Sequence, residues 1–112
     1  TQASLIARLV SSREEAKRLA TNKSFIDLLD QAKKFTELLL TDSNRAYLQV
    51  GVLVSLAVEK AEQGRLFDVL SLLLAERLTE MIAREKMDAV LKAKKMWQAN
   101  VSLQNCLEYL TM

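Results

Sequence analysis

Residues 25–40 decide the fold class, and they read FIDLLDQAKKFTELLL. Their apolar side chains recur at intervals of three and four residues, at Phe25, Leu28, Leu29, Ala32, Phe35, Leu38 and Leu39. Because an α-helix turns once in about 3.6 residues, this spacing forms one apolar face and leaves the other sides polar. We therefore expect a helix that begins after Ser24, whose hydroxyl can cap it, and that ends near Leu40.

The next segment begins at Thr41-Asp42-Ser43-Asn44, four residues that favour turns and helix caps. Beyond this turn, apolar residues continue a helical stripe at Tyr47, Val50, Leu53, Leu56 and Ala57. Residues 50–58 are apolar on most sides and rich in Val, so a β-strand is an alternative. A helix over residues 45–63 is favoured because the periodic segment is long, its end is charged, and no second strand exists to pair with it.

Two glycines affect the prediction for this helix. Gly51 weakens it by about 1 kcal/mol relative to Ala, and we expect a close approach to another backbone as compensation. Gly64 is a common type of helix stop, so the helix is expected to end there.

From Leu66 to Leu74 the chain is almost continuously apolar, so we expect the helix that contains this run to be the most buried element. The apolar stripe then changes phase, which predicts a bend or break between Ala75 and Lys86. A new stripe follows at Ala83, Met87, Val90, Leu91 and Trp97. The last long helix should run to about Ala99.

A short final helix is expected over residues 103–110. Ser102 is the predicted N-cap, and one face of the helix is apolar at Leu103, Cys106, Leu107 and Leu110. Asn100 suits the left-handed position that often follows a helix. The Asn100-Val101-Ser102 sequon is therefore interpreted as a chance match.

At the start of the chain, two short helices are predicted over residues 2–10 and 13–20, and Ser12 with Glu15 forms a capping-box pattern. A weak boundary lies near residues 21–24, where short helices give way to long ones. No internal repeat is visible. At 112 residues, the chain is expected to form one all-α, compact bundle of roughly five to seven helices.

Composition excludes several classes of protein. The net charge is only +2 and 50% of residues are hydrophobic, which does not favour nucleic acid or an anionic membrane as the main partner. No apolar run could span a bilayer and no signal peptide is visible. A single Cys fits a cytoplasmic protein. The chain begins at Thr1 rather than Met, which suggests a fragment or a processed chain.

Familiar catalytic sites are also excluded by residue type. Two isolated glycines cannot build a phosphate-binding loop, and a chain without His cannot form a Ser-His-Asp triad or a di-iron bundle. One Cys and no His make a zinc site improbable, and no cofactor is expected. Carboxylate pairs could serve acid–base chemistry, but solvated helix faces are the favoured reading; the pairs are Glu14/Glu15, Asp27/Asp30 and Glu76/Glu80.

The last long helix carries a charged face made of Arg84, Asp88, Lys92 and Lys95, with Lys94 beside it. This face could contact nucleic acid or an acidic partner, but a solvated outer face is favoured because the net charge is low. Trp97 is either a core anchor against the last helix or an interface hot spot, and the core is favoured. Cys106 is expected to be a buried small hydrophobe.

The end of the chain carries a resemblance to a known family. Residues 89–110 contain a Lys-rich helix, the Ala99-Asn100-Val101 corner, Gln104-Asn105, and Leu107-Glu108 followed by Leu110. This pattern resembles the C-terminus of the delta-prime subunits of the bacterial DNA polymerase III clamp loader. The middle of the chain is similar in its order of Leu-rich helices and in Asp42-x-x-Arg45-Ala46. The start looks like the end of the small helical lid that closes the nucleotide-binding region in this family.

The resemblance implies a collar domain at residues 22–112, preceded by a remnant of the helical lid at residues 1–21. In this family the collars of five subunits form a ring that holds the clamp loader together, and delta-prime is the rigid member, generally without productive ATP hydrolysis. The resemblance thus implies a non-enzymatic assembly domain whose partners are the ATPase subunits and delta. DNA contact by this fragment is not expected to dominate. The region before the last long helix looks short for the family.

We expect neighbouring subunits to contact exposed positions on the last two helices, namely Lys94, Gln98, Gln104 and Tyr109. Two other functions stay open. One is a stand-alone helical protein-interaction module, and the other, less favoured, is a helical DNA-binding domain in which the Lys-rich helix reads a groove.

Overall fold

The computed structural model describes residues 23–112. Within that range it contains five helices and no strand, which confirms the predicted all-α bundle. The helices are α3 (Lys23–Thr41), α4 (Ser43–Leu56), α5 (Lys60–Ala75), α6 (Met81–Gln98) and α7 (Leu103–Leu110). The two predicted N-terminal helices, the Ser12–Glu15 capping pattern and the predicted segment 1–21 lie outside the described residues.

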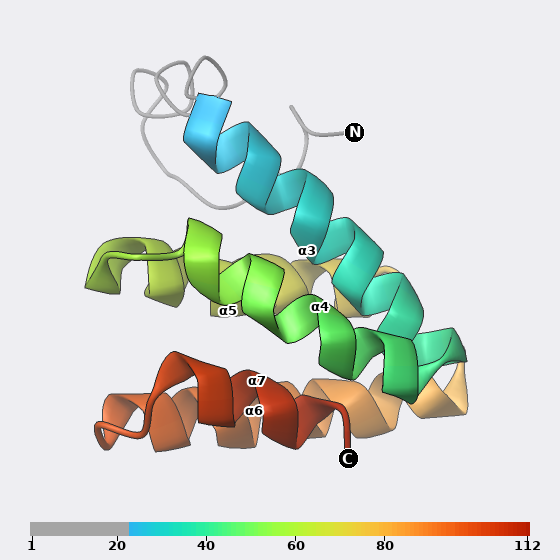
Figure 1. Ribbon diagram of the computed structural model, residues 1–112. Coiled ribbons are helices and arrows are strands. Elements are labelled where there is room, and N and C mark those ends of the chain that lie inside the picture. Colours follow the sequence, from blue (N-terminus) through green and yellow to red (C-terminus); the bar gives the residue numbers. More distant parts are fainter. Residues whose placement is uncertain (1–22) are drawn as a thin grey trace, which may run out of the picture.

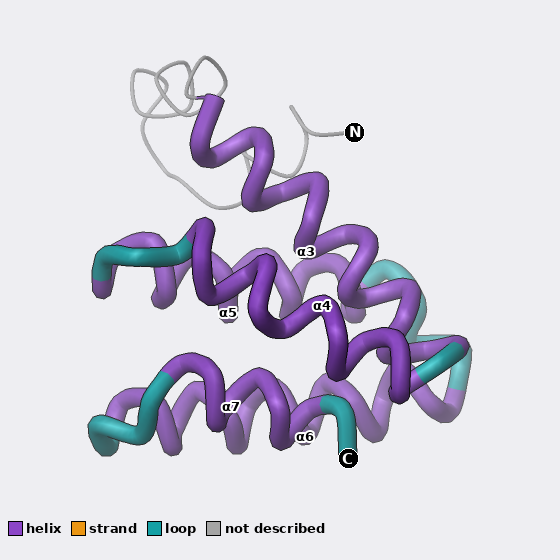
Figure 2. Tube along the Cα trace, viewed as in Figure 1, coloured by secondary structure: helices purple, strands orange, loops and turns teal. Residues whose placement is uncertain are grey.

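The helices form two groups in the view of Figure 1, in which α3, α4 and α5 lie above α6 and α7. α3 packs against both α4 and α5, while α6 packs against α5 and α7, and α7 also contacts α4. The connections between successive helices are short loops (Figure 2). In Figure 1, α4 lies on the near side of the molecule, next to α3 and α7, both of which it contacts.

The core is built from buried residues of all five helices, α3 to α7. α3 contributes more buried residues than any other described helix, seven in all: Phe25, Leu28, Leu29, Ala32, Phe35, Thr36 and Leu39. The prediction that the Leu66–Leu74 helix is the most buried element is therefore wrong. Leu72 and Leu73 are only half-buried, because α5 faces α3 and α6 on two sides and leaves the rest of its circumference toward solvent.

The predicted helix over residues 45–63 is two helices, and the expected stop at Gly64 is wrong. α4 ends at Leu56 and α5 begins at Lys60, so Gly64 lies inside α5. The break forms because Glu59 and Glu62 make a capping box that starts a new helix. The Gln63 side-chain amide also donates to the carbonyl oxygens of Ala57 at 3.1 Å and of Val58 at 3.4 Å. Polar side chains thus take over the backbone groups that a continuous helix would have paired.

The two glycines differ in their surroundings. A Cβ atom added at Gly64 would make an ordinary contact with the Trp97 ring at 3.4 Å, so the indole lies against α5 at this position. At Gly51, a Cβ atom would have no neighbour within 4 Å in the described part of the chain. The expected compensation for Gly51, close approach to another backbone, is therefore absent within the fold.

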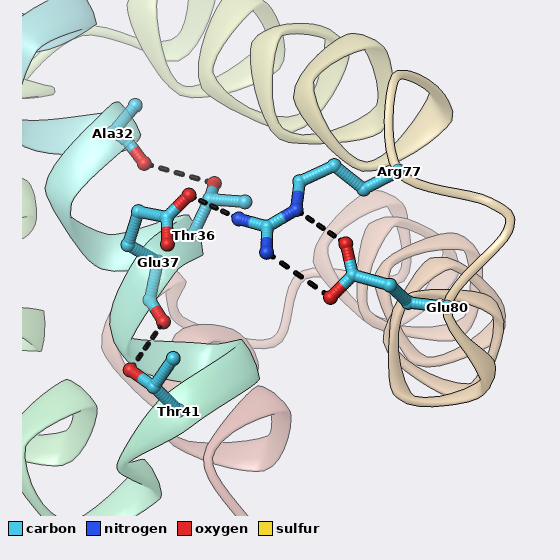
Figure 3. Close-up of polar contacts among 6 residues, drawn as sticks. All are labelled: Ala32, Thr36, Glu37, Thr41, Arg77 and Glu80. Atoms are coloured by element: carbon cyan, nitrogen blue, oxygen red, sulfur yellow. Dashed lines mark hydrogen bonds and ion pairs between the residues drawn. The ribbon is translucent and has the colours of Figure 1, made fainter.

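The predicted break between Ala75 and Lys86 is confirmed, since α5 ends at Ala75 and α6 begins at Met81. Arg77 holds the intervening turn against α3. Its guanidinium contacts Glu37 of α3 through Nη1 and Glu80 through Nε at 2.6 Å and Nη2 at 3.0 Å (Figure 3). These interactions, mainly the hydrogen bond to Glu80, raise the pKa of Arg77.

The predicted corner between the last two helices is also confirmed. Asn100 has a φ of 71°, in the left-handed region, and the Ser102 hydroxyl accepts from the Asn105 backbone N–H at 3.2 Å. Cys106 is fully buried, as predicted. Trp97 is half-buried at the edge of the core, where its ring contacts Phe67 of α5 and its Nε1 donates to Gln63 at 2.8 Å.

Candidate interaction surface

The outer side of α4 carries a group of exposed apolar residues. Three large apolar residues are exposed there: Tyr47 at 53%, Leu48 at 77% and Val52 at 39%. Gly51 and Ser55 lie between and beside them and are also exposed. We call these five residues (Tyr47, Leu48, Gly51, Val52 and Ser55) the α4 face.

The opposite side of α4 explains why this face points outward. Ala46, Gln49, Val50 and Leu53 are buried at helical spacing. They pack against α3 and α7, and the Gln49 amide donates to the Gln31 side chain of α3. The Asp42 side chain accepts from the Arg45 backbone N–H at 3.3 Å and starts the helix. Because the opposite side of α4 is buried against α3 and α7, the α4 face points toward solvent.

The charge distribution along α4 is asymmetric. Arg45, near the amino end, is the only charged residue of Ser43–Leu56, and the last turn contains no basic residue. Glu59 follows shortly after the helix ends. The apolar α4 face therefore has a positive charge at one end. At the other end lie the partial negative charge of the helix carboxyl terminus and an acidic residue.

Such a face is typical of a docking surface. Scattered exposed hydrophobic residues are common on proteins, whereas large contiguous apolar patches mark interaction sites, and the α4 face groups three exposed apolar residues on one side of a helix. Covering apolar surface contributes about 25 cal/mol for each Å² removed from water. The chemistry of the face therefore favours binding another apolar helix or sheet rather than a charged ligand.

A concave region lies between the α3–α4 turn and α6, with a volume of about 410 Å³. Its lining is Leu39, Leu40, Thr41, Asp42, Ser43, Ile82, Glu85, Lys86, Ala89 and Met112. The buried Lys86 ammonium donates to the carbonyl oxygens of Leu110 at 2.7 Å and of Met112 at 3.3 Å. Burial lowers the pKa of Lys86, and nearby Glu85 opposes that shift. Lys86 thus fastens the carboxyl end of α7, which is a structural role.

Of the four residues predicted to bind partners, two lie on α6 and two on α7. Lys94 donates to Asp68 of α5 at 3.1 Å, and Gln98 is exposed one turn further along α6. On α7, the exposed Gln104 donates to Glu108 at 3.3 Å, while Tyr109 is half-buried. Their role in binding stays a prediction.

The charged face predicted on the last long helix is largely paired within the fold. Lys92 forms an ion pair with Asp88 at 3.2 Å. The hydrogen bond to Asp88 raises the pKa of Lys92, and Tyr109 contributes in the same direction. Arg84 donates to the Leu78 carbonyl oxygen at 2.6 Å. With Lys94 on Asp68, these contacts leave less free positive charge for nucleic acid than the sequence suggests.

Among residues 23–112, no group of His, Cys, Asp and Glu side chains is placed to hold a metal ion. The helices of that region are also too short or too polar for any of them to cross a membrane. Burial raises the pKa of the Cys106 thiol, which does not suit a nucleophile.

Sequence reasoning missed the α4 face because it assigned Tyr47 to the buried stripe together with Val50 and Leu53. The structure instead leaves Tyr47 more than half exposed. A signal was present in the apolar character of residues 50–58, which exceeds what one buried side requires.

No family model, curated protein or solved structure matches the chain.

Proposed function

We propose that this chain is a non-catalytic assembly domain of a bacterial DNA polymerase III clamp loader, of the delta-prime type. It would pack with the collar domains of the ATPase subunits and delta, in the cytoplasm. The observation that carries the proposal is the α4 face, because an apolar helix face calls for a protein partner.

The C-terminal resemblance supports the same proposal. The Ala99-Asn100-Val101 corner and the residues around it carry the likeness to delta-prime, and each has a clear structural use in this chain. Asn100 makes the left-handed turn, Ser102 caps α7, and Leu107 and Leu110 are buried. The clamp-loader identity is supported by this resemblance, and the α4 face supports a protein partner.

The experiment is size exclusion coupled to light scattering, with this chain mixed with the collar domains of the ATPase subunits and delta from the same source. The proposal expects a complex of defined mass. It also expects Leu48→Asp to weaken that complex at least tenfold, because a carboxylate would be desolvated in an apolar contact.

Leu91→Asp is the matched control. Leu91 is also an exposed leucine, at 51%, but it lies on α6. If Leu91→Asp abolishes the complex and Leu48→Asp does not, the α4 face is not the interface. If no complex forms at micromolar concentrations, the clamp-loader proposal fails.

The α4 face also suits a stand-alone helical interaction module, which is the second candidate. Such a module would retain a partner that depends on Leu48 but would ignore the clamp-loader collars. The internal pairing of Lys92 and Lys94 makes groove reading by the Lys-rich helix the weaker alternative. That function would show binding to DNA that falls steeply with salt.

A further inference from the structure

We infer that two copies of this chain pair through the α4 face, with the two α4 helices antiparallel and crossing at Gly51. The pairing would be symmetric, so that each copy presents the same residues to the other. This goes beyond the proposed function, because it concerns the chain in the absence of other subunits.

Gly51 is the first feature of α4 that favours pairing with another helix. It lies in the middle of a helix, where glycine is unfavourable relative to alanine, and the described fold gives no steric reason for it. The same residue lies at the centre of the α4 face, between Leu48 and Ser55. A missing side chain at the centre of an apolar helix face allows another helix backbone to approach closely. Gly51 thus leaves room on the α4 face for a helix from outside the described fold.

Side-chain size supports a second copy as the occupant. In an antiparallel pair centred on Gly51, residues whose numbers lie equally far before and after Gly51 face each other. Tyr47 of one copy then lies over Ser55 of the other, and the reverse contact forms by symmetry. Ser55 offers a small surface, since its hydroxyl already donates to the Val52 carbonyl oxygen at 2.7 Å. The large aromatic ring therefore faces the smallest side chain available on that turn.

Charge supports the same orientation. The antiparallel arrangement places Arg45 of one copy beside the carboxyl end of the other copy's α4. That end carries partial negative charge and has no basic residue in its last turn, and Glu59 follows it. A parallel arrangement would instead place the two Arg45 side chains together. Because the pair is symmetric, the contact between Arg45 and the carboxyl end of α4 forms twice.

One helix face is small compared with the roughly 800 Å² that each partner buries in a stable interface. The pair is therefore expected to be weak and in exchange with the monomer. It would use the face that we assign to clamp-loader assembly, so the other collar domains should compete with it.

The test is sedimentation velocity of the full chain over a concentration series. We expect the mass to rise from 12.7 kDa toward twice that value as concentration increases. Gly51→Gln should shift the dissociation constant at least tenfold toward monomer while the melting temperature stays equal or rises, because glutamine favours helix and a Cβ atom at this position has no neighbour within 4 Å in the described part of the chain. The matched control is Gly64→Ala, a glycine replacement in α5, which should leave the dimer unchanged.

Cysteine pairs test the register. A mixture of Tyr47→Cys and Ser55→Cys chains should form a disulfide-linked dimer on mild oxidation, whereas either variant alone should form far less. Equal crosslinking in all samples, a dimer insensitive to Gly51→Gln, or a chain that stays monomeric at every concentration would overturn the inference. A monomeric chain would leave the clamp-loader proposal intact, since that proposal is tested by the mixed complex.

Discussion

Burial of the Lys86 charge makes the free energy of unfolding depend on pH. The Lys86 ammonium is fixed on the carbonyl oxygens of Leu110 and Met112, and burial lowers its pKa from the usual 10.5. Between the lowered pKa and 10.5, the unfolded chain binds more protons at this residue than the folded chain does. The free energy of unfolding contributed by Lys86 therefore rises with pH across that window.

We predict that this rise is lost in Lys86→Met, which keeps the side-chain length without the charge. The measurement is denaturant unfolding of both proteins at a series of pH values below 10.5. The stability of the natural chain minus that of the variant should increase with pH. Parallel pH profiles would contradict the assignment.

Gly64 is a second position at which a single residue can be tested. Gly64→Ala should raise the free energy of unfolding by about 0.5–1 kcal/mol, since alanine favours helix and the new Cβ makes only ordinary contact with Trp97. Gly64→Leu should instead displace the ring and its hydrogen bond to Gln63. Fluorescence of Trp97, the only Trp, reports the displacement. An unchanged spectrum in Gly64→Leu would show that the ring does not rest on α5.

At the scale of the helices, the corner between α6 and α7 depends on the left-handed Asn100. We predict that Asn100→Ala lowers the free energy of unfolding by about 1–2 kcal/mol, because a Cβ-bearing residue without Asn's local hydrogen bonding is strained there. Asn100→Gly is the matched control and should be neutral or slightly stabilising. Chemical denaturation measures both, and equal effects of the two variants would rule out backbone strain as the cause.

The helix boundaries also show what the sequence could and could not predict. The apolar face of α3, the break after Ala75 and the corner at Asn100 were predicted because their signals are local. The predicted start of α3 was wrong, since Ser24, the expected cap, lies inside the helix. The break after Leu56 was missed because apolar periodicity continues across it, and the residues that create it, Glu62 and Gln63, act on backbone groups several positions away.

The candidate site was less predictable than the fold for a related reason. α4 is apolar around most of its circumference, so its sequence alone does not say which side is covered. That choice is made by α3 and α7, through contacts such as Gln49 with Gln31. Tyr47 and Leu48 became recognisable as exposed only once those neighbours were in place.

For the molecule as a whole, stability depends on a core shared by helices from both groups. Phe35 is fully buried, and Phe35→Ala is predicted to cost about 3–5 kcal/mol. That is a large part of the roughly 5–15 kcal/mol that holds a typical domain together. Leu48→Ala, on the exposed α4 face, should change the free energy of unfolding by no more than about 0.5 kcal/mol. Denaturant titration of both variants checks the contrast, and a similar loss from each would mean that α4 is covered in the monomer.

The alkylation rate of Cys106 can report how often α7 opens. Cys106 is the only cysteine, it is fully buried in α7, and burial raises the pKa of its thiol. A small alkylating reagent can therefore modify the chain only while α7 is undocked. The rate of modification, compared with that of the unfolded chain, measures how often the last helix opens, without any mutation or attached label. If that rate is set by opening of α7 alone, it should exceed the rate expected from global unfolding. A partner that clamps α7 in place should slow it further.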